Sequence, residues 1–192
     1  MYGILAEDDS DVNTLKTFIR RLNKKSTAPS FRAKGYRGCG DLLRKGARDL
    51  RMLAEECTRF VVCYDSDRDD QDERRQSVMD KVIIPANLTQ PTCVLVPVQE
   101  IEAWLLSDLT ALAKVIPRWR GNNREILHPE SQNDPKEALE ALTRERGRPL
   151  YVNTIHNAKI AEHIDLETVH RKCPSFRPLG MLVQNGEGNT VR

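Results

Sequence analysis

Short apolar segments alternate with helix-like segments over the first 115 residues, and this alternation constrains the fold more than any other feature. Residues 2–6 (YGILA), 59–64 (RFVVCY) and 92–98 (TCVLVPV) have the length and composition of buried strands, and residues 30–33 predict a weaker one. Between them, apolar residues recur at helical spacing. The alternation predicts an α/β protein with a mostly parallel sheet of about four strands and helices on both faces.

Two helix boundaries follow from the same pattern. Ser10 or Asp11 is the expected N-cap of the first helix, because short polar side chains accept hydrogen bonds from the first helical turn. Residues 100–112 predict a single helix, with an apolar stripe that includes Trp104 and Leu109.

The alternation stops near residue 115, and the following residues to about 134 are polar and irregular. We expect Pro135 to open a helix and further helices over 157–163 and 165–172. The sequence therefore predicts an α/β core over residues 1–115 and a helical C-terminal extension over 116–192 that packs on it. The Gly-rich residues 185–192 predict a frayed tail.

Composition excludes several classes of protein. A chain of 192 residues buries enough surface to fold without a disulfide or zinc staple. Its five cysteines are odd in number and contain no CxxC pair, which argues against a zinc ribbon and a secreted disulfide framework. No run of about 18 apolar residues is present, and the first residues do not resemble a signal peptide. We therefore expect a reduced, cytoplasmic protein with no membrane span.

Charge is segregated along the chain although the formal net charge is only +2. Residues 16–51 contain twelve Lys or Arg and two Asp, whereas residues 65–80 contain seven acids and three Arg. Such runs are typical of solvated helix faces. The alternative is a flank that attracts phosphates beside an acidic pocket that needs a cation. Charge alone does not decide between these interpretations. The candidates for contact with a nucleic acid are Lys34, Arg37, Arg44 and Lys45.

Carboxylates directly follow three of the expected strands. Glu7 follows the first, Asp65 and Asp67 follow the third, and Glu100 and Glu102 follow the fourth. The carboxyl ends of parallel strands lie at one edge of a sheet, where open α/β folds bind ligands. Neighbouring carboxylates repel one another unless a cation lies between them, and oxygen-only ligands favour Mg²⁺ or Mn²⁺. The sequence predicts a divalent metal site at this edge.

The order of strand, Glu7, helix, strand and Asp65-Ser66-Asp67 resembles the Toprim domain of topoisomerases, bacterial primases and nucleases of the overcoming-lysogenization-defect class. Residues 102–108 (EAWLLSD) and 173–177 (CPSFR) resemble a bacterial family of small Toprim-like proteins of unknown function, often found beside an AAA-type ATPase. The resemblance implies a Toprim-like fold. It also implies that Asp65 and Asp67 hold the metal and that Glu7 is a ligand or the general acid/base. Glu102 and Glu100 would complete the site.

The reaction implied by this resemblance is hydrolysis. The chain has no second domain for the nucleophilic tyrosine of a topoisomerase, and its cysteines exclude the zinc module of a primase. A metal-dependent nuclease acting on the phosphodiester bonds of DNA or RNA remains, with a role in bacterial anti-phage defence beside an ATPase partner. The residues leave open the choice between DNA and RNA and whether the chain forms a homo-oligomer.

Two other functions remain open at this point. The first is a Toprim-fold binding or regulatory subunit without catalytic turnover. The second is a receiver-like phosphoacceptor domain, because the opening residues also resemble a response-regulator receiver. In that case Asp8 and Asp9 would bind Mg²⁺, and Asp65 would accept phosphate. The rest of the chain fits this poorly, since no Met-Pro follows Asp65 and no Lys-Pro follows a fifth strand.

Overall fold

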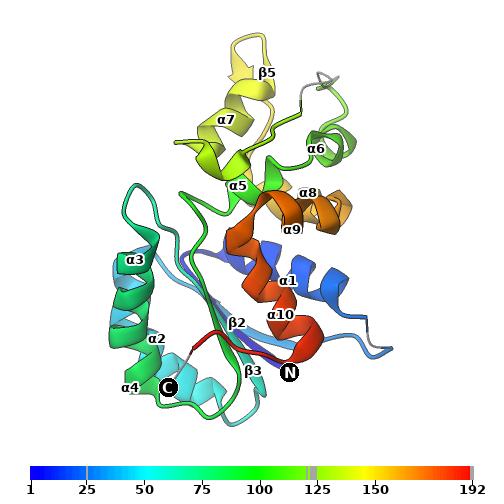
Figure 1. Cartoon of the computed structure of the whole chain (residues 1–192). Coiled ribbons are helices and arrows are strands. Elements are labelled where there is room, and N and C mark those ends of the chain that lie inside the picture. The colour runs from blue at the N-terminus through cyan, green and yellow to red at the C-terminus, as the bar shows by residue number, and fades with distance from the viewer. Residues whose placement is uncertain (25, 120, 122–124, 191–192) are drawn as a thin grey trace.

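The protein is an α/β structure built on a parallel sheet (Figure 1). The computed structural model describes residues 1–24, 26–119, 121 and 125–190. In this part of the chain four parallel strands lie in the order β2-β1-β3-β4. They are β1 (Tyr2–Ala6), β2 (Phe31–Gly35), β3 (Arg59–Cys63) and β4 (Thr92–Leu95). The predicted four-stranded parallel sheet with flanking helices is confirmed.

Helices cover both faces of the sheet (Figure 1). One face carries α1 (Asp9–Leu22) and α10 (Arg177–Asn185). The other carries α2 (Cys39–Leu53), α3 (Gln71–Val78), the π-helix η1 (Met79–Ile83) and α4 (Ile84–Ala86). Among the described residues, no helix has the length and apolar character needed to cross a membrane.

The remaining elements lie mostly beyond the carboxyl ends of the strands, above the sheet in Figure 1. Among them, the helices expected after Pro135 and over 157–163 and 165–172 are confirmed. The short hairpin formed by β5 and β6 was not predicted. These elements are α5 (Glu102–Leu105), α6 (Leu109–Val115), η2 (Pro129–Ser131), α7 (Pro135–Leu142), β5 (Arg144–Glu145), β6 (Arg148–Pro149), α8 (Asn153–His163), α9 (Leu166–Lys172) and η3 (Pro174–Phe176).

The strands are apolar on both sides because both faces of the sheet are covered. Ile4 and Val61 point into the cluster under α1 and α10, and Leu5 and Val62 point into the cluster under α2 and α3. The first cluster continues into the C-terminal part through edge-to-face aromatic contacts. The ring centroids of Phe176 lie 5.0 Å from Phe18 and 5.2 Å from Trp104. One apolar cluster thus spans the predicted boundary at residue 115.

The helix boundaries differ from the sequence-based expectation in two places. The N-cap of α1 is Asp8, whose Oδ1 accepts a hydrogen bond of 2.9 Å from the Asp11 amide, whereas Ser10 and Asp11 lie inside the first turn. The single helix expected over 100–112 is divided into α5 and α6. Asp108 has an extended backbone there and accepts from the Thr110 amide at 3.0 Å. A short carboxylate that bonds to the nearby backbone ends one helix and starts the next.

The C-terminal tail is ordered where a frayed segment was expected. After α10, the Asn189 side chain accepts from the Val94 amide at 2.8 Å and donates to the Val94 carbonyl at 2.9 Å. Arg75 also donates to the Asn189 carbonyl. The tail therefore satisfies backbone groups of β4 that a sheet edge otherwise leaves free. Residues 191–192 of the predicted tail lie outside the described residues.

Candidate functional site

Glu7 and Asp65 meet at the point where the strand order reverses. The connection after β1 leads outward to β2, and the connection after β3 leads in the opposite direction to β4. Glu7 directly follows β1, and its Oε1 accepts a hydrogen bond of 3.0 Å from the Asp65 amide. Open α/β sheets bind ligands at this reversal. The structure therefore brings together the two acids on which the sequence-based site mainly depends.

Glu102 lies buried at the start of α5, with 5% of its surface exposed. Its Oε1 accepts hydrogen bonds from Asn157 Nδ2 at 2.9 Å and from the Tyr151 hydroxyl at 3.2 Å. Both partners are themselves buried and belong to the C-terminal part of the chain. Glu100 accepts from the Lys136 amide of α7 at 3.3 Å. The extension therefore orients the two acids that follow β4.

Asp11 joins this group, although the sequence analysis treated it only as a cap. It is 7% exposed and lies on the buried stripe of α1 that also carries Leu15, Phe18 and Leu22. Its charge acts on Asp65 more strongly than that of any other neighbouring group. The spacing of the stripe contained the signal, because an acid in an apolar helical stripe is expected to be buried.

Asp67 turns away from the buried acids. Its side chain is 54% exposed and lies 3.2 Å from Arg74, although its charge still raises the pKa of Glu7. Its backbone has a positive φ of 52°, and its amide donates to the carbonyl of Gln99, which has a φ of 62°. Two non-glycine residues in the left-handed region therefore face each other between the loops that follow β3 and β4. Such backbone is unusual and is often found at functional sites.

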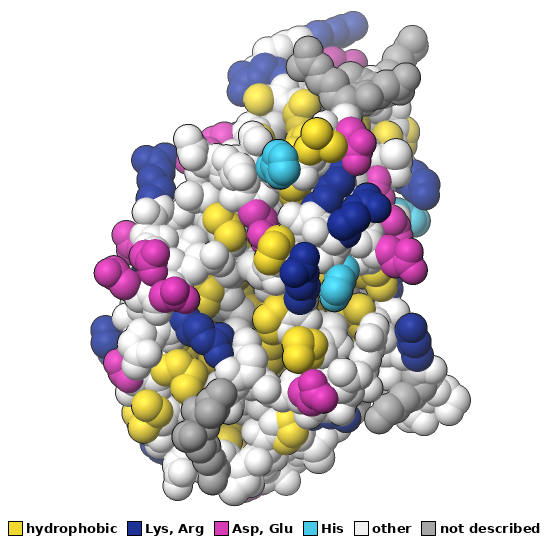
Figure 2. Space-filling view, in the orientation of Figure 1, with side chains coloured by type: hydrophobic (Ala, Val, Ile, Leu, Met, Phe, Trp, Pro, Cys, Tyr) yellow, Lys and Arg dark blue, Asp and Glu magenta, His cyan; other side chains and the backbone are white. Residues whose placement is uncertain are grey.

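The other acids of the 65–80 run form a solvated surface. Figure 2 shows acidic side chains gathered over α3 on the face presented. The exposed residues of this surface are Asp69, Asp70, Asp72, Glu73 and Asp80. These five acids form a solvated face. Asp65, in contrast, lies at the carboxyl end of the central strand β3.

Burial raises the pKa of every acid in the inner group, which consists of Glu7, Asp11, Asp65, Glu100 and Glu102. Loss of hydration raises the pKa of Glu7 and of Glu100 to about 7, against opposing hydrogen bonds from the amides of Asp65 and Lys136. For Asp65 burial is the main cause of a raised pKa, and repulsion from Asp11 and Glu7 adds to it. The pKa values of Asp11 and Glu102 are also raised, chiefly by burial. The group is stabilised by protons or by a cation.

The donor chemistry of this group fits a hard divalent cation. All of its side chains offer oxygen, as Mg²⁺ and Mn²⁺ prefer. Asp65 Oδ1 is buried and has no hydrogen-bond partner within the described residues. Among those same residues, however, no three His, Cys, Asp or Glu side chains are placed as a ready ligand set. Coordination of one ion by several of these acids therefore requires side-chain rotation from the present arrangement.

Three of the four basic candidates are paired inside the chain. Lys34 lies 2.6 Å from Asp49, and Lys45 lies 2.7 Å from Asp41, which also contacts Arg44. Arg37 is exposed in the loop that follows β2. This loop is tied to the acidic edge, because the Gly38 amide donates to the Glu7 carbonyl at 3.1 Å. Arg37 therefore presents its charge to solvent close to the backbone of Glu7.

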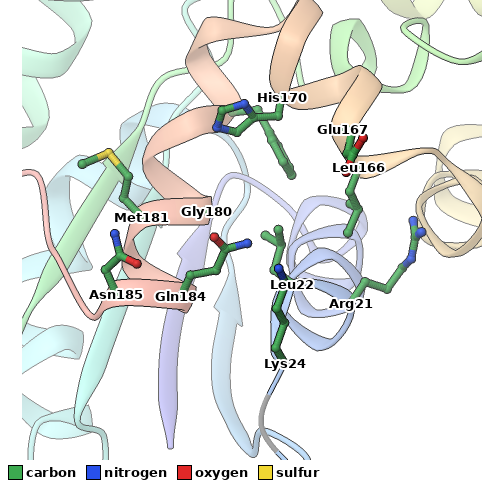
Figure 3. A pocket seen from close by; sticks show the side chains of 11 residues that line it. Arg21, Leu22, Lys24, Leu166, Glu167, His170, Gly180, Met181, Gln184 and Asn185 are labelled. Atoms are coloured by element: carbon green, nitrogen blue, oxygen red, sulfur yellow. The ribbon is translucent and has the colours of Figure 1, made fainter.

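A separate cavity of about 560 Å³ lies between the end of α1, α9 and α10 (Figure 3). Leu22 and Lys24 reach toward it from the end of α1, and His170 faces it from α9, whereas Arg21 turns toward α8. Glu167 is the one carboxylate in its described lining. This cavity is distinct from the acidic edge.

The fold and site define an α/β protein with buried carboxylates at the carboxyl edge of a parallel sheet. Residues 6–180 match the model of a family described as a domain of unknown function, DUF4276, and the chain belongs to this family. The match includes Glu7, Asp11, Asp65, Glu100 and Glu102 and the residues that hold Glu102. No curated protein and no solved structure matches the chain.

Proposed function

We propose that this protein is a metal-dependent nuclease of Toprim type that hydrolyses phosphodiester bonds of DNA or RNA. The observation that carries the proposal is the contact of Glu7 with the Asp65 amide, together with the charges of Asp11, Glu100 and Glu102 that act on Asp65, whose Oδ1 has no hydrogen-bond partner among the described residues. Glu7, Asp65 and Glu102, with Glu100, would hold Mg²⁺ or Mn²⁺. The predicted ligand Asp67 would have to leave Arg74 to take part.

In the proposed hydrolysis, the cation and Glu7 would have different roles. A divalent cation supplies Lewis acidity and lowers the pKa of a bound water. Glu7 has a pKa of about 7, so near neutral pH it can accept a proton from water or return one. Its Oε1 is fixed by the Asp65 amide, which leaves Oε2 for proton transfer or for a metal bond. Both roles of Glu7 remain within the proposal.

The biological role rests on the family resemblance alone. That resemblance implies an AAA-type ATPase partner and a role in anti-phage defence. The cysteine pattern separately favours a cytoplasmic location. An ATPase partner would place the nucleic acid on the acidic edge, where Arg37 is exposed and, among the described residues, makes no ion pair within 4 Å.

A plasmid-nicking assay with titrated Mg²⁺ or Mn²⁺ tests the proposal. Asp65→Asn and Glu7→Gln should each lower the nicking rate by at least ~100-fold, because each removes a charge that the reaction needs. Asp80→Asn is the matched control, since Asp80 lies exposed on η1 and bonds to Gln76. Equal nicking by all four proteins would mean that the activity comes from a contaminant or from another site.

A binding subunit without turnover is the second candidate. The observation that favours it is the lack of a ready ligand set among the described acids. Calorimetric titration with Mn²⁺, together with nicking assays with and without the ATPase partner, separates the two functions. Mn²⁺ binding without nicking under either condition would favour the binding subunit.

A receiver-like phosphoacceptor has less support. The Asp8 carboxylate caps α1 through the Asp11 amide, and Asp9 is exposed. Incubation with a small phosphodonor decides the matter. A stable acylphosphate on Asp65 would replace the nuclease proposal.

A further inference from the structure

Two buried side-chain atoms in the described part of the chain have no hydrogen-bond partner, and both belong to residues around Glu7. They are the acceptor Asp65 Oδ1 and the donor Arg74 Nε. Glu7 accepts a hydrogen bond from the Asp65 amide, and the positive charge of Arg74 lowers its pKa. Buried polar groups are normally paired, so each unpaired group calls for an explanation. Asp65 Oδ1 can be satisfied by a cation, whereas Arg74 Nε needs an acceptor.

Arg74 is held firmly by its surroundings. Its side chain is 18% exposed, and its guanidinium lies 5.2 Å from the ring centre of Tyr64, to whose hydroxyl Nη1 donates at 2.8 Å. Nη2 lies 3.2 Å from Asp67 and 2.8 Å from Asp69. Both carboxylates are more than half exposed, so water competes for them. The arginine is thus preorganised, and its buried Nε has no acceptor among the described residues.

A second cation, Lys136, lies beside the acids that follow β4, because its amide donates to Glu100 at 3.3 Å. Lys136 stands at the start of α7, and its charge lowers the pKa values of Glu100 and Glu102. It has no ion-pair partner within 4 Å among the described residues. The ion pair of Arg68 with Asp134, at 2.6 Å, links the loop after β3 to the start of α7. It thus connects the segments that lead to Arg74 and to Lys136.

We propose that Arg74, near Glu7, and Lys136, beside Glu100, bind phosphate oxygens of a nucleic-acid strand at the carboxyl edge of the sheet. The identification of the anion as a phosphodiester rests on the proposed function. A phosphate group approaching buried carboxylates is repelled unless cations stand beside them. Arginine suits this role because its planar donors match phosphate oxygens, and lysine contributes a mobile point charge. Lys34, Arg44 and Lys45 lie in ion pairs as Arg74 does, but among the described residues only Arg74 keeps a buried donor without a partner.

Binding of a short fluorescein-labelled DNA strand, followed by anisotropy over a range of salt concentrations in Ca²⁺, tests the proposal. Each phosphate contact contributes about 0.7 to the slope of log affinity against log salt for a single strand. Arg74→Gln and Lys136→Gln should each lower the slope by about that amount and weaken binding by about tenfold at low salt. Arg74→Lys should keep the slope but weaken binding, because it keeps the charge and loses the planar donors.

Two matched controls lie near the amino ends of the strands. Arg51 is exposed near the end of α2 and donates to the Pro85 carbonyl, and Lys81 is exposed on η1. Arg51→Gln and Lys81→Gln should leave the slope unchanged. Circular dichroism of each variant verifies that it is folded, and Arg74→Lys provides the test if Arg74→Gln does not fold.

The outcomes separate this inference from the proposed function. Wild-type slopes in both glutamine variants would overturn the inference, even if the wild type nicks plasmid DNA. Absence of salt-dependent strand binding by the wild type would overturn it as well. Reduced slopes in a protein that neither binds Mn²⁺ nor nicks DNA would support the anion site and reject the nuclease.

Discussion

At the scale of single residues, the acids of the site depend on neighbours that hold them in place. Glu102 is the clearest case, because Tyr151 and Asn157 donate to the same carboxylate oxygen. The hydroxyl of Tyr151 also contacts Asn157 Oδ1, so the three side chains form one buried network. Such partners orient metal ligands and are often needed for full metal affinity.

Tyr151→Phe should lower the affinity for Mn²⁺ by about 10-fold. The change removes one donor to Glu102 and leaves the ring in the core, so the fold should persist. Calorimetric titration with Mn²⁺ measures the effect. Tyr2→Phe is the control, since the Tyr2 hydroxyl contacts Arg59 at 3.1 Å at the other end of the sheet. Equal affinity in both variants would remove Tyr151 from the site.

Gly35→Ala should lower the free energy of unfolding by about 1–3 kcal/mol. A Cβ at this position would lie 2.5 Å from backbone atoms of Asp8 and Asp9, directly after Glu7. The backbone of the site would have to move to admit it. Gly40→Ala is the matched control, because a Cβ there meets nothing within 4 Å and α2 prefers alanine. Urea denaturation compares the two, and an unchanged midpoint for Gly35→Ala would contradict the expectation.

At the scale of elements, the strand ends carry a destabilising group of buried acids. Their folded-state pKa values lie above the ordinary values, to about 7 for Glu7 and Glu100. The folded protein therefore binds more protons than the unfolded chain between about pH 4.5 and 7. Stability falls with rising pH wherever the folded state holds more protons. The contribution of these acids is thus most favourable near pH 4.5 and is lost as pH rises through 7.

The melting temperature in EDTA should accordingly fall as pH rises from 4.5 to 7.5, and Mg²⁺ should restore it at the upper end. His156 acts in the opposite sense, because burial lowers its pKa. Acids with lowered pKa values, such as Asp108 and Glu125, also oppose the trend, but chiefly below about pH 4.5. Glu7→Gln should flatten the profile, since glutamine does not titrate. Differential scanning calorimetry measures both proteins. A melting temperature that rises steadily over this range would show that the acids are not buried together.

The tail after α10 is the second feature at this scale. Asn189→Ala removes both side-chain bonds to Val94 and should lower the free energy of unfolding by about 1–2 kcal/mol. The uncovered edge of β4 should also promote self-association, because free strand edges pair with one another. Gln184→Ala, an exposed position on α10, is the control. Urea denaturation and size-exclusion chromatography measure the two effects, and an unaltered variant would show that the tail is dispensable.

At the scale of the whole molecule, the C-terminal part completes both the core and the site. Phe176 packs against Phe18 and Trp104, and Asn157 reaches Glu102. In addition, Arg21 of α1 donates to the carbonyls of Ala161, at 2.7 Å, and Ile164, at 2.6 Å, at the end of α8. The buried face of α1 therefore depends on residues far beyond position 115.

A fragment of residues 1–115 should not fold cooperatively. Removal of the C-terminal part exposes the apolar face of α1 and the Trp104 side chain. Burial of each large apolar side chain stabilises a folded protein by roughly 1.5–3 kcal/mol. Urea denaturation followed by tryptophan fluorescence compares the fragment with the full chain. A cooperative transition in the fragment would support an independent core that ends at residue 115.

Local sequence patterns were sufficient for the sheet and for most of the helices. Apolar runs of four or five residues and helical periodicity depend on neighbours in the chain, so the four strands and α7, α8 and α9 were predicted. The division of 100–112 at Asp108 and the helix α10 were not, because a side chain bonded to the backbone and packing on the sheet outweighed periodicity.

The strand-end acids Glu7, Asp65, Glu100 and Glu102 were predicted as a site because parallel strands end at one edge, a consequence of chain order alone. Burial and pairing depend on distant segments and were settled by tertiary packing. This packing buried Asp11 against the site, turned Asp67 to Arg74, and brought Tyr151 and Asn157 to Glu102. The sequence shows which residues carry charge, but the folded chain determines how strongly each charged group is hydrated and which groups lie beside it. These two factors set its pKa and therefore its chemistry.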